Sequence, residues 1–293
     1  MSELSPEEIN IIQHKATEPA FSGEYDNFHI NGIYLCKQCS SVLYRSMDKF
    51  NSGCGWPSFD DEIPEAIKKL TDSDGRRTEI LCQNCDGHLG HVFLGEQKTA
   101  KNIRHCVNSL SMKFISIEKL LEQDNTNNNF GKLILAGGCF WGIEYFYELE
   151  AGVLATACGY IGGETQHPTY KQVCSGKTNH AEAVAIIFDK NKTNETKLLD
   201  LFFDIHNPTE INKQGPDIGS QYRSAIFVIN SNINTQKEII ENYINNFKKN
   251  NNSKIATQIE NTEKFWLAED SHQKYFSSRN QAPSCHYRRS NNT

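Results

Sequence analysis

The chain has 293 residues, ten cysteines and a formal net charge of −6, and this length is enough for two ordinary domains. Residues 1–120 hold 13 Lys and Arg against 17 Asp and Glu, and residues 131–293 hold 17 of each. Neither half therefore has the basic surface that nucleic-acid binding requires. No apolar run approaches the roughly 20 residues of a membrane span, and no secretory signal opens the chain. We expect a cytoplasmic protein, with no nucleic-acid or membrane partner, whose cysteines serve metal or redox chemistry.

The first elements in the chain predict a small β domain. Ser5-Pro6-Glu7-Glu8 has an N-cap residue, Pro at the first helical position and acidic residues in the first turn, so it predicts a helix to about Lys15. Short β-type runs separated by turn residues follow, and they are typical of a compact antiparallel fold. We expect strands at 30–35, 41–44, 78–81, 91–94 and 111–117.

Two CxxC pairs, Cys36–Cys39 and Cys82–Cys85, each follow directly on a β-type run. Four thiolates in two such pairs are the ligand set of a tetrahedral structural zinc ion. The pairs are farther apart than in a simple zinc ribbon, so the ion would join distant parts of the domain. The alternative is a redox-active CxxC, but that chemistry requires one motif at a strand-to-helix turn.

Two further cysteines of this half lie outside the pairs. Cys54 lies in an irregular loop flanked by glycines, and Cys106 follows Arg104 and His105, two groups that we expect to lower its pKa. His88 and His91 stand near the second CxxC pair. They are alternative metal ligands, but with four cysteines available we expect them to act as hydrogen-bond donors in a pocket.

An Asn-rich run at 124–129 interrupts the apolar periodicity and predicts a linker over 121–130. We therefore expect one domain over 1–120 and a second over 131–293. No internal repeat relates the two.

The second domain is organised around Gly137-Gly138-Cys139-Phe140-Trp141-Gly142. An apolar strand at 132–136 leads into two glycines that allow a sharp turn, and a helical pattern begins at the cysteine. A cysteine at a helix N-terminus is favoured as a thiolate, and the two aromatic residues can form an apolar slot beside it. The alternative is a buried structural cysteine at a strand-to-helix turn.

The rest of this half alternates helices with strands, as in an α/β or α+β domain. We expect a turn at 159–163, a loop containing Tyr170, and a strand at 180–188 that carries Glu182 near its start. A buried glutamate would have a raised pKa and act as an acid; the alternative is a surface position on the strand. Further helices are expected at 200–206 and 235–249, and strands at 225–229 and 255–259.

The tail contains Cys285 after Ala282-Pro283-Ser284. An irregular, mobile tail suits a resolving thiol that has to reach Cys139, and a stray cysteine is the alternative. Cys158 and Cys174 have no assignable role and are expected to be small buried residues.

Over residues 5–118, the two CxxC pairs with GCGWPSF, GHLGHVF and RHCVNS resemble the methionine sulfoxide reductase B family as a set. The resemblance implies a mainly antiparallel β fold with structural zinc that reduces the R epimer of methionine sulfoxide in protein chains. It makes Cys106 the nucleophile and Cys54 the resolving thiol. It places Trp56 on the substrate methyl group, and around the sulfoxide it places His88, His91, Arg104 and Asn108.

Over residues 131–287, GCFWG, GYIGG, HPTY, HAEAV and QGPDIGSQYRS resemble the methionine sulfoxide reductase A family. The resemblance implies an α+β sandwich with a mixed sheet and a ferredoxin-like core that reduces the S epimer. Cys139 would be the nucleophile, Glu182 the acid and Cys285 the resolving thiol. The substrate would be held by Phe140, Trp141, Tyr170, Asp217 and Tyr222. Asn179 replaces the usual Gly, and the tail has no glycine-rich extension with a second resolving cysteine.

Both resemblances imply the same chemistry. A cysteine attacks the sulfoxide, methionine leaves, and the resulting sulfenic acid condenses with a second cysteine to a disulfide. Thioredoxin would then reduce this disulfide, with no organic cofactor. Two other classes are a zinc-stabilised module fused to a thiol peroxidase or disulfide isomerase, and a non-catalytic zinc-ribbon protein. The first does not explain aromatic residues beside two nucleophiles, and the acidic charge is poor evidence for the second.

Overall fold

The computed structural model describes residues 3–72, 75–123, 129–229, 233–251 and 254–289. The chain divides into two compact units, Met1–Lys119 and Leu120–Thr293, and each is described by itself. Residues 124–128, half of the predicted linker at 121–130, lie outside the described residues. No helix in the described ranges is long and apolar enough to cross a membrane.

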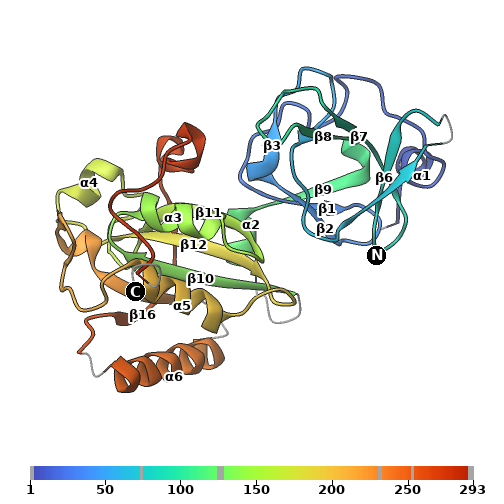
Figure 1. Ribbon diagram of the computed structural model, residues 1–293. Helices are drawn as coiled ribbons and strands as arrows, with labels where there is room; N and C mark the ends of the chain where they lie inside the picture. The colour runs from blue at the N-terminus through green and yellow to red at the C-terminus, as the bar shows by residue number, and fades with distance from the viewer. Residues whose placement is uncertain (1–2, 73–74, 124–128, 230–232, 252–253, 290–293) are drawn as a thin grey trace. The chain divides into compact units, whose positions relative to one another are not determined.

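Unit 1 begins with a short capped helix and continues as two antiparallel sheets (Figure 1). The helix α1 covers Pro6–Ile12, where Ser5 accepts from the Glu8 amide and the Glu8 carboxylate accepts from the Ser5 amide. This reciprocal capping box stabilises the helix start, as the sequence predicted. One sheet has the order β2-β1-β9, with β1 at Gly32–Cys36, β2 at Val42–Arg45 and β9 at Met112–Ser116.

The other sheet of unit 1 has the order β3-β4-β8-β7-β6-β5, with antiparallel neighbours throughout. Its strands are β3 Lys49–Phe50, β4 Ser58–Phe59, β5 Ile67–Thr71, β6 Thr78–Cys82, β7 His88–Leu94 and β8 Ile103–Val107. The antiparallel β fold is therefore confirmed. The predicted strands omit β3, β4, β5 and β8, because polar residues interrupt their apolar pattern, and β8 carries Cys106.

Unit 2 is built on a mixed six-stranded sheet in the order β16-β15-β10-β12-β11-β17, counted over the described residues. The segment β10-α3-β11-β12-α5-β15 forms four adjacent antiparallel strands in the order β15-β10-β12-β11, which is a ferredoxin-like core. Only β16 pairs in parallel, with β15. The strands are β10 Phe130–Gly137, β11 Val153–Ile161, β12 Ala181–Asp189, β15 Ser224–Ile229, β16 Gln258–Thr262 and β17 Trp266–Leu267.

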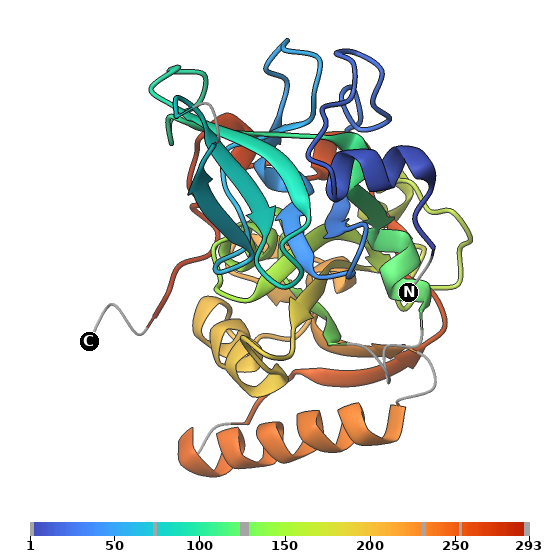
Figure 2. The same ribbon diagram turned by 90° about the vertical axis from the view of Figure 1, so that its right-hand side faces the viewer.

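The helices of unit 2 share one hydrophobic core with this sheet. The Tyr147 hydroxyl of α3 donates to the Leu198 carbonyl of α5 at 2.6 Å, so these two helices cover the same face. The helix α6 packs on α5 and β15, and Figure 2 shows it as the long orange helix. The helices of unit 2 are α3 Phe140–Glu148, α4 Tyr170–Cys174, α5 Glu195–Ile205 and α6 Ile233–Asn251, and α2 Ile117–Glu122 spans the boundary between the units.

Two predictions for unit 2 were wrong in their local detail. Gly159 and Tyr160 are not in a turn but continue β11, because they pair with the equally buried β12. Tyr170 is not in a loop but opens α4, since Thr169 and Gln172 form a capping box. Before β15, a short hairpin is formed by β13 (Lys213–Gln214) and β14 (Asp217–Ile218).

Candidate active sites and metal centre

The four cysteines of the CxxC pairs converge in unit 1. Their Sγ atoms all lie within 4.8 Å of one another, with 3.6 Å between Cys36 and Cys85 and the same distance between Cys39 and Cys82. Each pair begins at the end of a strand and continues into a matching turn. In those turns the amides of Ser40 and Asp86, both with positive φ, donate to the carbonyls of Cys36 and Cys82. Two similar loops therefore present four thiols to one centre, which suits a metal ion.

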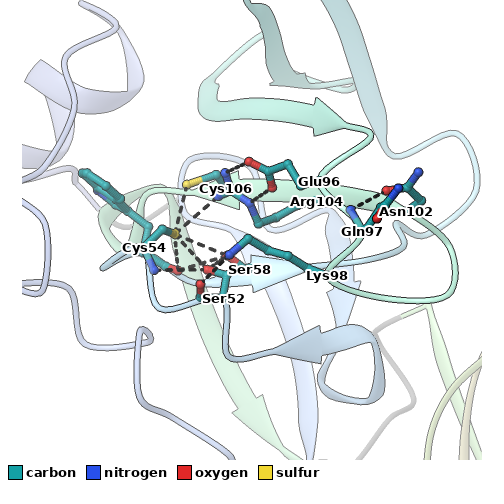
Figure 3. Close-up of polar contacts among 10 residues, drawn as sticks. Ser52, Cys54, Ser58, Glu96, Gln97, Lys98, Asn102, Arg104 and Cys106 are labelled. Atoms are coloured by element: carbon teal, nitrogen blue, oxygen red, sulfur yellow. Dashed lines mark hydrogen bonds and ion pairs between the residues drawn. The ribbon is translucent and has the colours of Figure 1, made fainter.

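A second group of sulfur atoms lies between β4 and β8. Cys54 Sγ is 3.8 Å from Cys106 Sγ, and both side chains are half-buried (Figure 3). Ser52 Oγ donates to Cys54 at 2.9 Å, and Arg104 Nη1 donates at 3.3 Å. Arg104 is held in turn by two hydrogen bonds to the Glu96 carboxylate. The loop cysteine and the strand cysteine thus lie within reach of a disulfide bond.

The charges at this pair differ from the prediction. Burial raises the pKa of Cys54. Hydrogen bonds with the Ser52 side chain and the Trp56 backbone outweigh the effect of burial, so the pKa is lowered overall. Burial and then the Cys54 charge raise the pKa of Cys106 to about 12. Arg104 lowers the pKa of Cys106, as expected, but burial and the Cys54 charge outweigh its effect, so the pKa is raised overall. Arg104 binds Cys54, while His105, which alternates to the other face of β8, contacts Tyr44.

Four other predicted residues of unit 1 are held by local contacts. His91 pairs with Cys106 in the β7–β8 register, and its Nε2 is 2.9 Å from Asp72 Oδ2. His88 is 2% exposed; its Nδ1 is 2.7 Å from Glu79 Oε1, and its Nε2 has no hydrogen bond within the described chain. Burial lowers the pKa of His88, so the ring is neutral. The two remaining residues are fixed by hydrogen bonds, Trp56 Nε1 to the Glu18 carbonyl and Asn108 Nδ2 to the Leu89 carbonyl.

The central cysteine of unit 2 is the N-cap residue of α3, as predicted. Its partner is Cys285, whose sulfur is hydrogen-bonded to Cys139 without any movement of the tail. This hydrogen bond, followed by burial and the nearby Glu182 charge, raises the pKa of Cys139. The same bond and His286 lower the pKa of Cys285 to about 5. This arrangement does not favour the expected Cys139 thiolate, because its neighbours and its burial raise the pKa of Cys139.

Glu182 is buried beside this thiol pair. It is 1% exposed and its Oε2 accepts from the Phe140 amide at 3.3 Å, at the start of α3. Burial raises the pKa of Glu182 to about 8, so the carboxyl group is protonated at neutral pH. A surface position for Glu182 is thereby excluded.

Tyr160 is a neighbour of Glu182 that the sequence analysis did not select. It pairs directly with Glu182 in the β11–β12 register, and its ring centroid is 5.9 Å from that of Phe140. Its hydroxyl donates to Glu269 at 2.9 Å. The residue lies in the GYIGG motif, but assigning that motif to a turn hid its position opposite Glu182.

The predicted substrate residues of unit 2 gather around Glu182. Tyr170 and Tyr222 are half-buried and interact electrostatically with the Glu182 carboxyl, and Asp217 interacts with Cys285. Phe140 is 1% exposed, whereas Trp141 is half-buried and stacks on Tyr275 with centroids 3.7 Å apart. The aromatic rings and the acid therefore lie at the same end of the sheet as the thiol pair.

The two unassigned cysteines of unit 2 differ in exposure. Cys158 is fully buried and its sulfur donates to Glu144 Oε2 at 3.2 Å, as expected of a core residue. Cys174 is exposed at the end of α4, so the expectation that it is buried was wrong.

Two separate folds, each with a contacting thiol pair beside an acid or a histidine, define the class of a two-site thiol oxidoreductase. The chain matches the family model for peptide methionine sulfoxide reductase over residues 131–293 and that for the SelR domain over residues 4–116. It is 54% identical over 115 residues to peptide methionine sulfoxide reductase B9 of Arabidopsis thaliana, covering 39% of this chain and 80% of that protein.

The second half has its own relatives. It is 43% identical over 153 residues to peptide methionine sulfoxide reductase MsrA of Natronomonas pharaonis, covering 52% of this chain and 84% of that one. The reduced crystal structure of Mxr1 from Saccharomyces cerevisiae is 34% identical, with a TM-score of 0.51, and the match covers 55% of this chain and 93% of that one. This chain belongs to the peptide methionine sulfoxide reductases and combines an MsrB and an MsrA domain. It is an oxidoreductase that reduces both epimers of methionine sulfoxide.

Proposed function

We propose that unit 1 reduces the R epimer with Cys106 as nucleophile and Cys54 as resolving thiol. The observation that carries this assignment is the 3.8 Å contact between the two sulfurs. In the proposed reaction Cys106 attacks the sulfoxide sulfur, methionine leaves, and Cys106 becomes a sulfenic acid. Cys54, to which Ser52 and Arg104 donate hydrogen bonds that favour its thiolate form, then displaces hydroxide from it and closes the disulfide. His88, His91 and Asn108 surround the oxygen, and Trp56 contacts the methyl group.

Unit 2 reduces the S epimer in this proposal, with Cys139 as nucleophile and Cys285 as resolving thiol. Glu182 is the general acid because burial keeps it protonated at neutral pH beside the thiol pair. Tyr170, Tyr222 and Asp217 orient the oxygen, and Phe140 with Trp141 holds the methyl group. Tyr160, opposite Glu182, joins this set.

The four-cysteine centre of unit 1 is proposed to hold Zn²⁺. Thiolates bind zinc at about 2.3 Å in a tetrahedron, whose edges are then about 3.8 Å long. The observed 3.6 Å distances between the Sγ atoms fit that geometry. The bound ion would supply folding free energy by joining the β1 and β6 ends, and no catalytic step involves it.

A dithiol protein such as thioredoxin is proposed to restore both sites in the cytoplasm. Cys54 and Cys285 are half-buried rather than sealed, so an incoming thiolate can reach a disulfide that contains them. A reducing compartment suits a chain with ten cysteines, six of which lie outside these two pairs.

The assignment is tested with resolved epimers on the full chain. Cys139→Ser is expected to abolish turnover of the S epimer only, and Cys106→Ser that of the R epimer only, each by more than about a thousandfold. Each variant is the control for the other, because the second site remains. Equal loss of both activities in either variant would refute the assignment of one epimer to each unit.

A further inference from the structure

His286 follows the proposed resolving cysteine and is the most deeply buried residue of the described tail, at 2% exposed. Its Nε2 lies 2.9 Å from the Gly137 carbonyl. A carbonyl only accepts hydrogen bonds, so Nε2 carries a hydrogen, and Nδ1 is the nitrogen that is placed to accept one. Nδ1 lies 3.2 Å from Cys285 Sγ. The backbone at the end of β10 therefore fixes the tautomer that can take a proton from Cys285.

The glycines around Cys139 make room for this ring. A Cβ atom on Gly142 would lie 2.3 Å from His286 Nδ1, and one on Gly138 would lie 3.3 Å from its Cε1. A side chain at Gly142 would also come within 3.1 Å of Cys285 Sγ. Gly142 lies within α3, where no turn requires a glycine. Its place in the motif is explained by the close approach of the tail.

We propose that His286 is the general base of the step in which Cys285 resolves the oxidised Cys139. This role rests on the proposed function of unit 2 and adds a catalytic residue to it. The ring touches the sulfur that reacts, and its other nitrogen is anchored to the strand that leads into Cys139.

In this step the Cys285 sulfur attacks the sulfur of the Cys139 sulfenic acid. The S–S bond forms as the S–O bond of Cys139 breaks, so the Cys285 thiol is oxidised and the sulfenic acid is reduced. Cys285 passes to His286 Nδ1 the proton that it took from the Cys139 thiol when Cys139 attacked the sulfoxide. The departing hydroxide takes a proton from Glu182, which regained one from solvent after methionine left, and leaves as water. The proton on His286 then returns through solvent to Glu182, and both groups are ready for the next cycle.

A base is needed because the interaction that lowers the pKa of Cys285 in the reduced enzyme is lost once Cys139 is oxidised. In the reduced enzyme the Cys139 thiol donates to Cys285 and is the main cause of the lowered Cys285 pKa. Oxidation of Cys139 removes that thiol hydrogen. His286 is then the remaining hydrogen-bond partner of the Cys285 side chain within the described chain.

The test uses the full chain with Cys106→Ser, so that all turnover takes place at Cys139. The chain is mixed with excess S epimer and no reductant, and both released methionine and remaining thiols are followed in time at pH 7. With His286→Gln, methionine release should keep its amplitude of about one per chain, while disulfide formation should slow about a hundredfold. Disulfide formation within twofold of the parent would overturn the proposal. Absence of methionine release in the parent would instead refute the proposed function of unit 2.

A pH series separates a base from a structural role. The titratable groups around this pair are Cys139 before α3, Glu182 in β12, Asp217 in β14 and His206 after α5. All are kept in the variant. Its disulfide rate should rise about tenfold per pH unit, because the thiolate then has to form without help. Slowing by one constant factor at every pH would overturn the proposal.

Two further variants complete the test. Tyr287→Gln makes the same change at the neighbouring residue, which is 59% exposed, and should leave both steps unchanged. His286→Asn removes the base with a smaller side chain, and it decides the outcome if His286→Gln does not release methionine.

Discussion

The charges on the four proposed catalytic cysteines follow one pattern in both sites. The pKa is raised for Cys106 and Cys139 and lowered for Cys54 and Cys285. Burial contributes to both raised values. The lowered values come from hydrogen bonds, for Cys54 with Ser52 and other residues of its own loop, and for Cys285 with Cys139 and His286. Because the thiolate is the form that oxidants attack, a proposed nucleophile that remains a thiol at rest is protected from adventitious oxidation. When substrate is bound, the proposed nucleophile can pass its proton to the resolving cysteine beside it, whose pKa is lowered.

The raised pKa of Glu182 predicts how turnover of the S epimer depends on pH. Its pKa is raised to about 8, so the acid is protonated below that pH, and turnover of the S epimer should fall as the pH rises through about 8. Glu182→Gln keeps the amide contact but supplies no proton, so it should lower kcat/KM about a hundredfold and abolish this alkaline limb. The measurement is kcat/KM for the S epimer against pH.

The matched control is Glu144→Gln. Glu144 is another buried glutamate of unit 2, and burial raises its pKa to about 7, but it binds Cys158 and the Lys274 amide rather than the thiol pair. The alkaline limb should persist in that variant. Its persistence in Glu182→Gln would show that a different group supplies the proton.

At the scale of elements, strand pairing places the reacting groups. β8 carries Cys106, and its neighbour β7 carries His91 directly opposite. The strands approach closely at Gly90, where an added Cβ atom would lie 2.0 Å from the Cys106 carbonyl oxygen. In unit 2 the pairing of β11 with β12 sets Tyr160 beside Glu182 in the same way. The spacing of two strands thus determines the geometry of each site.

Gly90→Ala tests this dependence. The added methyl group must push β7 away from β8, so the variant should lose about 1–3 kcal/mol of unfolding free energy and most of its R turnover. Calorimetry and assays with each epimer measure the two effects, and S turnover is the internal control. Gly95→Ala is the matched control. Gly95 also has a positive φ, but a Cβ atom there would meet nothing within 4 Å, so this variant should keep R turnover. Full R activity in Gly90→Ala would show that the strand spacing does not control the site.

At the scale of the molecule, each unit has its own hydrophobic core and its own thiol pair. Sulfoxides are chiral at sulfur, and repair requires one enzyme for each epimer. Joining the two folds in one chain keeps both activities in equal amounts. The proposed metal centre belongs to unit 1 alone.

Loss of the metal should therefore separate the two activities. Cys82→Ser, or removal of zinc with a chelator, should remove most of the folding free energy of unit 1, because structural zinc contributes about 10–16 kcal/mol and an ordinary domain has only about 5–15 kcal/mol. R turnover should disappear while S turnover stays within about twofold. Cys174→Ser, at an exposed cysteine, is the control. Parallel loss of both activities on chelation would show that the units do not act independently.

The sequence determined the parts of this protein that depend on short stretches of chain. The capping box at Ser5, the CxxC turns and the helix start at Cys139 each depend on residues within a few positions of one another. The sets of motifs were also specific enough to identify both families, as the comparisons confirm.

The tertiary structure alone decided in which direction the pKa of each sulfur shifts, and which residues complete the sites. A pKa depends on burial and on neighbours brought from elsewhere in the chain, so no pattern near Cys106 or Cys139 reveals it. Tyr160 becomes visible only through the register with β12, and His286 only through the contact of the tail with Gly137. Local sequence identifies the reactive atoms, whereas long-range packing sets their protonation and their partners.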